Sequence, residues 1–203
     1  MNAEWHPIKD LSLKQLTLKT LALIALSSSD RGQTLHLMNI ENTVIEDDAI
    51  TFVIFDRLKN SKKVIKPKEV KCVTTSNPSL NVADYVTAYL NKTLMLRIKE
   101  VNKGKPKPTQ LFLSWATEKP VSKQTLSRWL KTVLGLAGID TKQFSAHSYR
   151  GAGLSTALAK GVPIEKIIAH GDWKNVNTFK SHYSAPCESS PIGQIILNHV
   201  NKS

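Results

Sequence analysis

Apolar residues recur at helical spacing along most of the chain. Residues 12–25 form the first such segment, where Ser12 and Gln15 have the spacing of a capping box. A short second helix is predicted over residues 33–38. The same spacing returns in four later stretches, near residues 82–90, 122–137, 146–160 and 163–169. Glycines 138, 161 and 171 follow the last three stretches and are expected to end those helices, with Pro163 at the first position of the last one.

Residues 49–73 have a different pattern. Residues 50–55 are β-branched or aromatic and predict a strand, and residues 59–63 form a polar turn. Valine and isoleucine in residues 64–73 predict one or two returning strands, which Pro67 confines to a sheet edge. The chain is therefore expected to have an α+β fold that is mainly α-helical, with a small antiparallel sheet.

Composition adds one unusual feature, a strong positive charge. The 203 residues are 41% hydrophobic and 22% charged, which is ordinary for a folded domain. Lysine and arginine number 28 against 16 acidic residues, which gives a net charge of +12. A polyanion, nucleic acid above all, is the expected partner, and the alternative is a basic protein with no such partner.

Other partners and compartments are less favoured by the sequence. The longest apolar run, residues 21–26, is far shorter than the roughly 18 residues of a membrane span, and the first residues lack a signal-peptide pattern. No membrane partner is therefore predicted. Cys72 and Cys187 are the only cysteines, which excludes a disulfide scaffold or a zinc cluster built on thiolates. An intracellular location is expected.

His147 and Arg150 are the first candidates for chemistry. They lie three residues apart at the start of a predicted helix, so they share one face with Cβ atoms about 5–6 Å apart. A guanidinium binds two phosphate oxygens, an imidazole moves a proton, and a helix N-terminus attracts anions. This pair suits a phosphate site, although a surface histidine and arginine paired with carboxylates fit the same spacing.

Further residues extend this pair into an ordered set. The set is Arg31, Lys59, His147, Arg150, Trp173 and Tyr183. It resembles the tyrosine recombinase (phage integrase) family, whose catalytic residues run Arg, Lys, His-x-x-Arg, His or Trp, and Tyr. The local sequence is most similar to that of the recombinases of DIRS-type and Crypton-type eukaryotic mobile elements, in residues 31–37, 126–131, 137–140 and 144–148. The resemblance covers residues 11–183.

The resemblance implies the catalytic-domain fold of this family and a function in site-specific recombination or integration of double-stranded DNA. It implies that Tyr183 attacks the scissile phosphate, forms a 3′-phosphotyrosine and releases a 5′-hydroxyl. Arg31 and Arg150 would bind the non-bridging oxygens, and Lys59 would protonate the leaving oxygen. No metal or small-molecule cofactor is required.

The resemblance gives the remaining two roles as well. His147 would accept or orient the tyrosine proton, and Trp173 would donate its indole N–H to a phosphate oxygen. His170 is an alternative for the role of Trp173, but thirteen residues separate it from Tyr183, more than is usual in the family. Lys62 and Lys63 are alternatives to Lys59. Tyr149 is expected to be structural.

Two departures from the family pattern stand out. Thr34 occupies a position where many prokaryotic relatives have a carboxylate, and Asp30 is a candidate to compensate. The chain also lacks room for the helical domain that normally precedes the catalytic one, so a fragment or an isolated catalytic domain is expected. Residues 1–186 are assigned to the catalytic domain. Residues 187–203 are assigned to a tail whose apolar spacing suits docking on a neighbouring copy or on the chain itself.

The family acts as tetramers on DNA, so a homo-oligomer is expected. Two other functions are open: a catalytically silent or truncated remnant of a mobile element that binds DNA, and an enzyme similar to type IB topoisomerases. The location is expected to be nuclear if the protein is eukaryotic and cytoplasmic otherwise.

Overall fold

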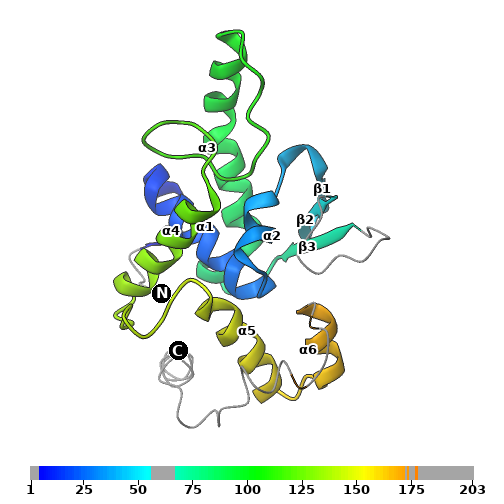
Figure 1. Cartoon of the computed structure of the whole chain (residues 1–203). Coiled ribbons are helices and arrows are strands. Elements are labelled where there is room, and N and C mark those ends of the chain that lie inside the picture. The colour runs from blue at the N-terminus through cyan, green and yellow to red at the C-terminus, as the bar shows by residue number, and fades with distance from the viewer. Residues whose placement is uncertain (1–4, 56–66, 172, 174–176, 178–203) are drawn as a thin grey trace.

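The computed structural model describes residues 5–55, 67–171, 173 and 177, and it shows helices packed around a small sheet (Figure 1). The helices are α1 (Leu13–Ser28), α2 (Gly32–Leu37), α3 (Val82–Asn102), α4 (Lys123–Leu136), α5 (Ser148–Ala159) and α6 (Ile164–His170). The strands are β1 (Thr43–Ile45), β2 (Ala49–Ile54) and β3 (Lys68–Val73). Single 3₁₀ turns occupy Ile8–Asp10, Ile40–Asn42 and Pro78–Leu80. The predicted fold class is confirmed.

Local capping explains where the helices begin and end. Ser12 caps α1 through the predicted capping box, and its hydroxyl accepts a hydrogen bond from the Gln15 amide (3.3 Å). The helix continues three residues beyond the predicted end, and in its last turn the Ser27 hydroxyl donates to the Ile24 carbonyl (3.3 Å). It stops at Ser29, whose φ of 51° is left-handed. Pro163 precedes α6 instead of starting it, since α6 begins at Ile164.

The sheet is antiparallel, in the order β1-β2-β3. The central strand β2 is almost entirely buried, and Phe52 lies opposite Thr43 on one side and Val70 on the other. One returning strand is present among the described residues, and it begins directly after Pro67 at the edge of the sheet. The predicted turn at residues 59–63 lies outside the described residues.

The core surrounds α1, which contacts α3, α4 and α5. Three of the largest buried side chains are cationic, Lys19, Arg97 and Arg150, and their burial was not predicted from the sequence. Lys19 lies 4.9 Å from the ring centre of Tyr85, and burial lowers the pKa of its ammonium group. Arg97 donates hydrogen bonds to the carbonyls of Pro108, Gln110 and Leu111, which anchors the strand-like segment after α3. No described helix is long and apolar enough to span a bilayer.

A second, smaller apolar cluster lies between α5 and α6 around Leu154 and Ile167. In Figure 1 these two helices occupy the end of the molecule away from the tip of α3. Helix α5 reaches the main core through its contact with the end of α1. At this contact, a Cβ atom on Gly153 would collide with the Ser29 hydroxyl and lie 2.7 Å from the Leu26 carbonyl oxygen. Glycine thus permits the close approach of the two helices.

Gly153→Ala is expected to destabilise the protein by about 1–3 kcal/mol because the added methyl group has no space against α1. Urea denaturation measures the change in the free energy of unfolding. Gly135→Ala is the matched control, because its Cβ would make an ordinary 3.6 Å contact with the Thr141 methyl group on an exposed helix. This control should gain up to about 1 kcal/mol from helix propensity. Equal stability of Gly153→Ala and the parent would contradict the close packing of α5 on α1.

Candidate active site

The guanidinium group of Arg150 lies at the junction of three helices. Arg150 is in α5 and is only 2% exposed. Its Nη1 donates to the Ser29 carbonyl at the end of α1 (3.1 Å), and its Nη2 donates to the Gly171 carbonyl at the end of α6. The Arg150 side chain is therefore held in one orientation by two backbone acceptors, as a phosphate-binding cation requires.

Trp173 completes this arrangement. The centre of its indole ring is 4.9 Å from the guanidinium carbon of Arg150, within the range of a cation–π contact. A Cβ atom at Gly171 would lie 2.6 Å from the indole and 3.2 Å from Arg150 Nη2. The glycine therefore allows the indole and the guanidinium to approach each other closely.

The last residue of α1 and the three residues that connect it to α2, Ser28–Arg31, are called the α1–α2 junction below. The Ser28 carbonyl accepts a hydrogen bond from His170 Nε2 (2.6 Å), and the Ser29 carbonyl accepts one from Arg150. Asp30 forms an ion pair with Lys68 at the start of β3 (2.8 Å). Arg31, which is half-buried, directly precedes α2. The junction thus binds Arg150 at Ser29, two residues before Arg31, although more than a hundred residues separate the two arginines in the sequence.

His147 lies directly before α5, one turn from Arg150. The predicted helix start near residue 146 is therefore two residues early. The side chain of His147 is exposed, whereas Arg150 is buried. The same end of α5 presents an exposed imidazole and holds a buried guanidinium.

His170 and Trp173, the two candidates for one role, differ in their contacts. The His170 ring bonds to the Ser28 carbonyl and so fastens α6 to α1. Trp173 packs directly against Arg150. Of the two candidates, Trp173 is therefore the one that contacts Arg150, and His170 contacts the end of α1.

The described residues do not include Tyr183, Lys59 or the alternatives to Lys59, which are Lys62 and Lys63. Lys68 was not predicted from the sequence, because nothing local marks a lysine at a strand start as the partner of a distant aspartate. Asp30 forms an ion pair with Lys68, and its compensation for the carboxylate that Thr34 replaces stays a prediction.

The other three of the four tyrosines are buried in the core. The hydroxyl of Tyr85 donates to the Trp5 carbonyl (2.9 Å), and that of Tyr149 donates to the Leu130 carbonyl (3.1 Å). The Tyr89 hydroxyl accepts from the Leu113 amide (2.9 Å). Burial raises the pKa of all three phenols, which opposes formation of a phenolate. None of these three side chains has the exposure that an attacking nucleophile needs.

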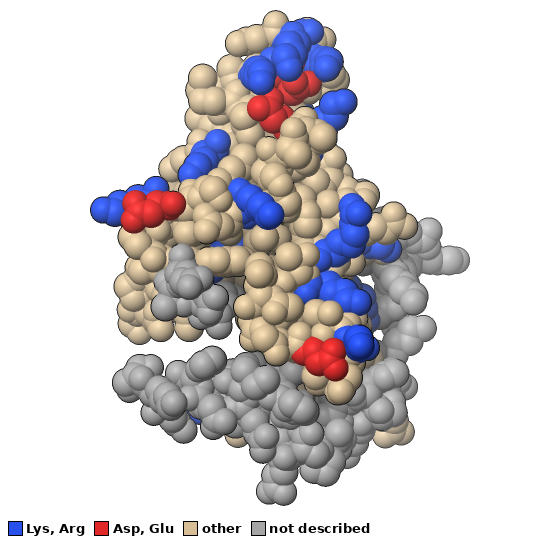
Figure 2. Space-filling model, turned by 90° about the vertical axis from the view of Figure 1, so that its left-hand side faces the viewer, with Lys and Arg blue, Asp and Glu red and all other residues tan. Residues whose placement is uncertain are grey.

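The surface next to Arg31 is basic. Helix α4 packs against α2, and the Cβ position of Gly32 is 4.0 Å from a side-chain carbon of Lys123. Lys123, Arg128 and Lys131 of α4 are exposed, and this helix contains no acidic residue. Figure 2 shows lysine and arginine side chains distributed over one face of the molecule, with fewer carboxylates among them. A polyanion is the ligand that such a surface attracts.

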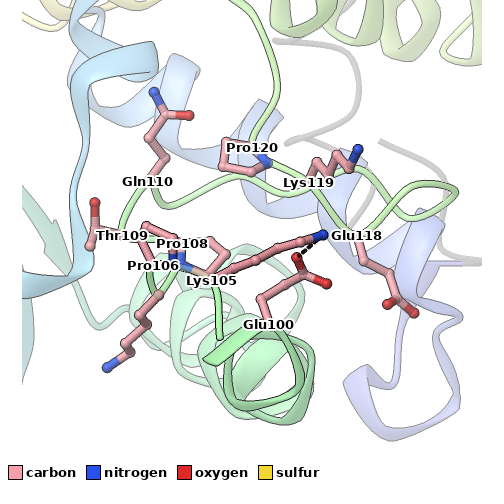
Figure 3. A pocket seen from close by; sticks show the side chains of 10 residues that line it. Glu100, Lys105, Pro106, Pro108, Thr109, Gln110, Glu118, Lys119 and Pro120 are labelled. Atoms are coloured by element: carbon pink, nitrogen blue, oxygen red, sulfur yellow. Dashed lines mark ion pairs between the residues drawn. The ribbon is translucent and has the colours of Figure 1, made fainter. Parts of the chain in front are cut away.

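A hollow of about 760 Å³ lies elsewhere, between the end of α3 and the loops around residues 105–110 and 118–120 (Figure 3). Three of its charged side chains are engaged in ion pairs, Glu100 with Lys105 (3.4 Å) and Glu118 with Lys99 (2.8 Å). None of the four predicted site residues that the structure describes, Arg31, His147, Arg150 and Trp173, lines it. Within the described residues, no group of three or more His, Cys, Asp or Glu side chains is placed to hold a metal ion.

The fold and the site together define a class of protein. Residues 6–189 match the model of the phage integrase family, and the chain belongs to this family. No curated protein matches the sequence. The predicted resemblance to the family is thereby confirmed, while its finer resemblance to DIRS-type and Crypton-type elements stays a prediction.

Solved structures share the fold. The XerH site-specific recombinase, in a pre-cleavage complex with its difH substrate, has a TM-score of 0.60 at 17% identity. The match covers 84% of this chain and 44% of XerH. The XerA recombinase has a TM-score of 0.59 at 15% identity over 94% of this chain and 60% of XerA. A lambda integrase dimer bound to a core site scores 0.51 at 14% identity over 90% of this chain and 45% of the integrase. This chain thus spans less than two thirds of each of these proteins.

Proposed function

We propose that this chain is the catalytic domain of a site-specific DNA recombinase that cuts and rejoins duplex DNA through a 3′-phosphotyrosine. The observation that carries the proposal is Arg150, held by two backbone carbonyls beside Trp173 and next to the junction that contains Arg31. Family membership supports the same reading, and the XerH structures were obtained with DNA before and after cleavage.

In the proposed reaction, the phenol oxygen of Tyr183 attacks the scissile phosphorus. A bond forms between this oxygen and phosphorus, and the bond from phosphorus to the 5′-oxygen breaks. His147 accepts the phenol proton, and Lys59 donates a proton to the leaving 5′-oxygen. One phosphate ester replaces another, so the reverse reaction with a 5′-hydroxyl of a second strand rejoins DNA without an external energy source.

The two arginines are proposed to stabilise the negative charge that develops on the non-bridging oxygens. The guanidinium of Arg150 is already fixed by the Ser29 and Gly171 carbonyls, so it needs little reorganisation as the charge develops. The indole of Trp173 covers this guanidinium and is proposed to donate its N–H to a phosphate oxygen. The assignment of Tyr183 as the nucleophile is supported by the burial of the other three tyrosines.

Covalent trapping tests the proposal. The protein is mixed with nicked duplexes whose central bases are randomised, and the mixture is denatured and examined for protein–DNA adducts. An adduct is the expected result, and sequencing of the trapped DNA identifies the site. Absence of an adduct from every duplex would favour the alternative of a silent remnant that binds DNA. Relaxation of supercoiled plasmid without recombination would favour an activity of the topoisomerase type.

Binding to duplex DNA is expected to weaken steeply with salt. The net charge of +12 and the basic face of α4 imply several phosphate contacts, so the affinity should fall on the order of 100-fold between about 50 and 200 mM salt. Lys123→Gln should lower the slope of log affinity against log salt by about 0.9. Lys99→Gln is the control, because Lys99 lies near the end of α3 and is paired with Glu118. An affinity that does not change with salt would contradict a nucleic-acid partner.

The proposal also covers the domain organisation of the chain, its oligomeric state and the kind of genetic element that it comes from. We assign residues 1–186 to the catalytic domain and residues 187–203 to a tail that docks on a neighbouring copy in a tetramer on DNA. The local sequence around Arg31 supports an origin in a DIRS-type or Crypton-type mobile element. The proposed location is nuclear in a eukaryote and cytoplasmic otherwise. Light scattering of the protein with and without its DNA site measures the number of copies, and a monomer on DNA would contradict the tetramer.

A further inference from the structure

The carboxylate of Asp30 forms a buried ion pair directly beside Arg31. Its partner is the ammonium group of Lys68, at 2.8 Å, and the two side chains are only 5% and 15% exposed. Lys71, on the same strand as Lys68, forms an ion pair with Glu46, and these two side chains are 52% and 49% exposed. A buried ion pair contributes little net stability because both charges lose their hydration, whereas removal of one partner leaves the other charge uncompensated.

The geometry that the pair fixes is that of the α1–α2 junction. Ser28 and Ser29 are attached to α6 and α5 through their backbone carbonyls. Asp30 attaches the same segment to β3, and it does so through its side chain. Arg31 is the next residue, at the start of α2. The attachments to α5 and α6 use backbone carbonyls, which every residue type provides. The ion pair uses the side chain of Asp30, so of these three attachments it is the one that a substitution at residue 30 removes.

The two partners also balance each other's charge. Asp30 places a carboxylate one residue before Arg31 in the chain, at a site proposed to bind an anion. The ammonium group of Lys68 binds this carboxylate at 2.8 Å and offsets its charge. The pair therefore attaches the junction to the sheet without adding a net negative charge to a site that must bind an anion.

We propose that Asp30 is a positioning residue that acts through Lys68 to hold Arg31 in place for the scissile phosphate. This inference rests on the proposed recombinase function. Asp30→Asn keeps the shape of the side chain and removes its charge. The rate of adduct formation should fall on the order of 100-fold, since a displacement of about 1 Å at a catalytic group has this effect. The affinity for DNA should change little.

The experiment compares single-turnover adduct formation on two nicked duplexes. One carries a normal scissile phosphate, and the other carries a methylphosphonate there, which lacks the negative charge that Arg31 is proposed to stabilise. Arg31→Ala should be strongly impaired on the phosphate and much less on the methylphosphonate. Asp30→Asn should follow the same pattern, with a defect at least 10-fold smaller on the methylphosphonate. Glu46→Gln, which breaks the exposed pair on β3, should react like the wild type on both.

Variants of Lys68 keep the test decisive if Asp30→Asn does not fold. Lys68→Gln should show the substrate-dependent defect, and Lys68→Arg should retain activity because it preserves the ion pair. An equal defect of the Asp30 or Lys68 variants on both substrates indicates a general structural role and overturns the inference, as does a wild-type rate. A wild-type chain that forms no adduct on either substrate overturns the proposed function and this inference with it.

Discussion

Tyr183→Phe is expected to abolish the covalent protein–DNA adduct while leaving folding and DNA binding near normal. The substitution removes one oxygen atom, and in the proposed reaction this oxygen forms the bond to phosphorus. The remaining side chain has the same size and ring. Denaturing electrophoresis of protein mixed with nicked duplex measures the adduct, and a binding titration measures the affinity of the folded protein for DNA.

Tyr149→Phe is the matched control for this loss. Tyr149 is buried, and its hydroxyl donates to the Leu130 carbonyl (3.1 Å). Its removal should cost about 1 kcal/mol of stability and leave adduct formation intact. Tyr85 and Tyr89 are buried with similar backbone bonds, so they offer no replacement nucleophile. An adduct that persists in Tyr183→Phe would contradict the assignment, and sequencing of the attached peptide would locate the true nucleophile.

The helices were predictable because the signals that define them are local. The capping box at Ser12 and the left-handed Gly138 after α4 each lie within a few residues of the helix end that they determine. Strand β1 was missed for the opposite reason. It has three residues, two of which are exposed, so it has no buried face that a sequence pattern would reveal. Its position follows from pairing with β2.

The sequence proposes the candidate site as a set of residues, and it carries no information on the contacts that orient them. His147 and Arg150 stand in one motif, which indicates a phosphate site only together with the ordered set of residues around it. The bonds that orient Arg150 come from Ser29 and Gly171, which lie in other helix ends and contribute only backbone atoms. Every residue type has a backbone carbonyl, so the sequence could not identify which carbonyls accept these hydrogen bonds. The burial of Arg97 is similar, because its partners are also backbone carbonyls.

Arg150→Lys is expected to reduce the rate of adduct formation by about 10²- to 10³-fold although the positive charge is retained. The planar guanidinium donates in two directions, to the Ser29 and Gly171 carbonyls, while its face lies against Trp173. A lysine ammonium is a compact point charge on a flexible chain and cannot reproduce this fork or the stacking. The ends of α1 and α6 should also lose a common anchor, so the melting temperature is expected to fall.

Two measurements separate the catalytic from the structural part of this effect. Single-turnover adduct formation is measured well below the melting temperature of the variant, where circular dichroism confirms that it is folded. Arg128→Lys on the exposed face of α4 is the control, because Arg128 makes one long side-chain hydrogen bond, to Thr125 (3.3 Å). It should keep the wild-type rate of adduct formation. Retention of that rate by folded Arg150→Lys would show that a positive charge alone suffices at this position and would contradict the role proposed for the oriented guanidinium.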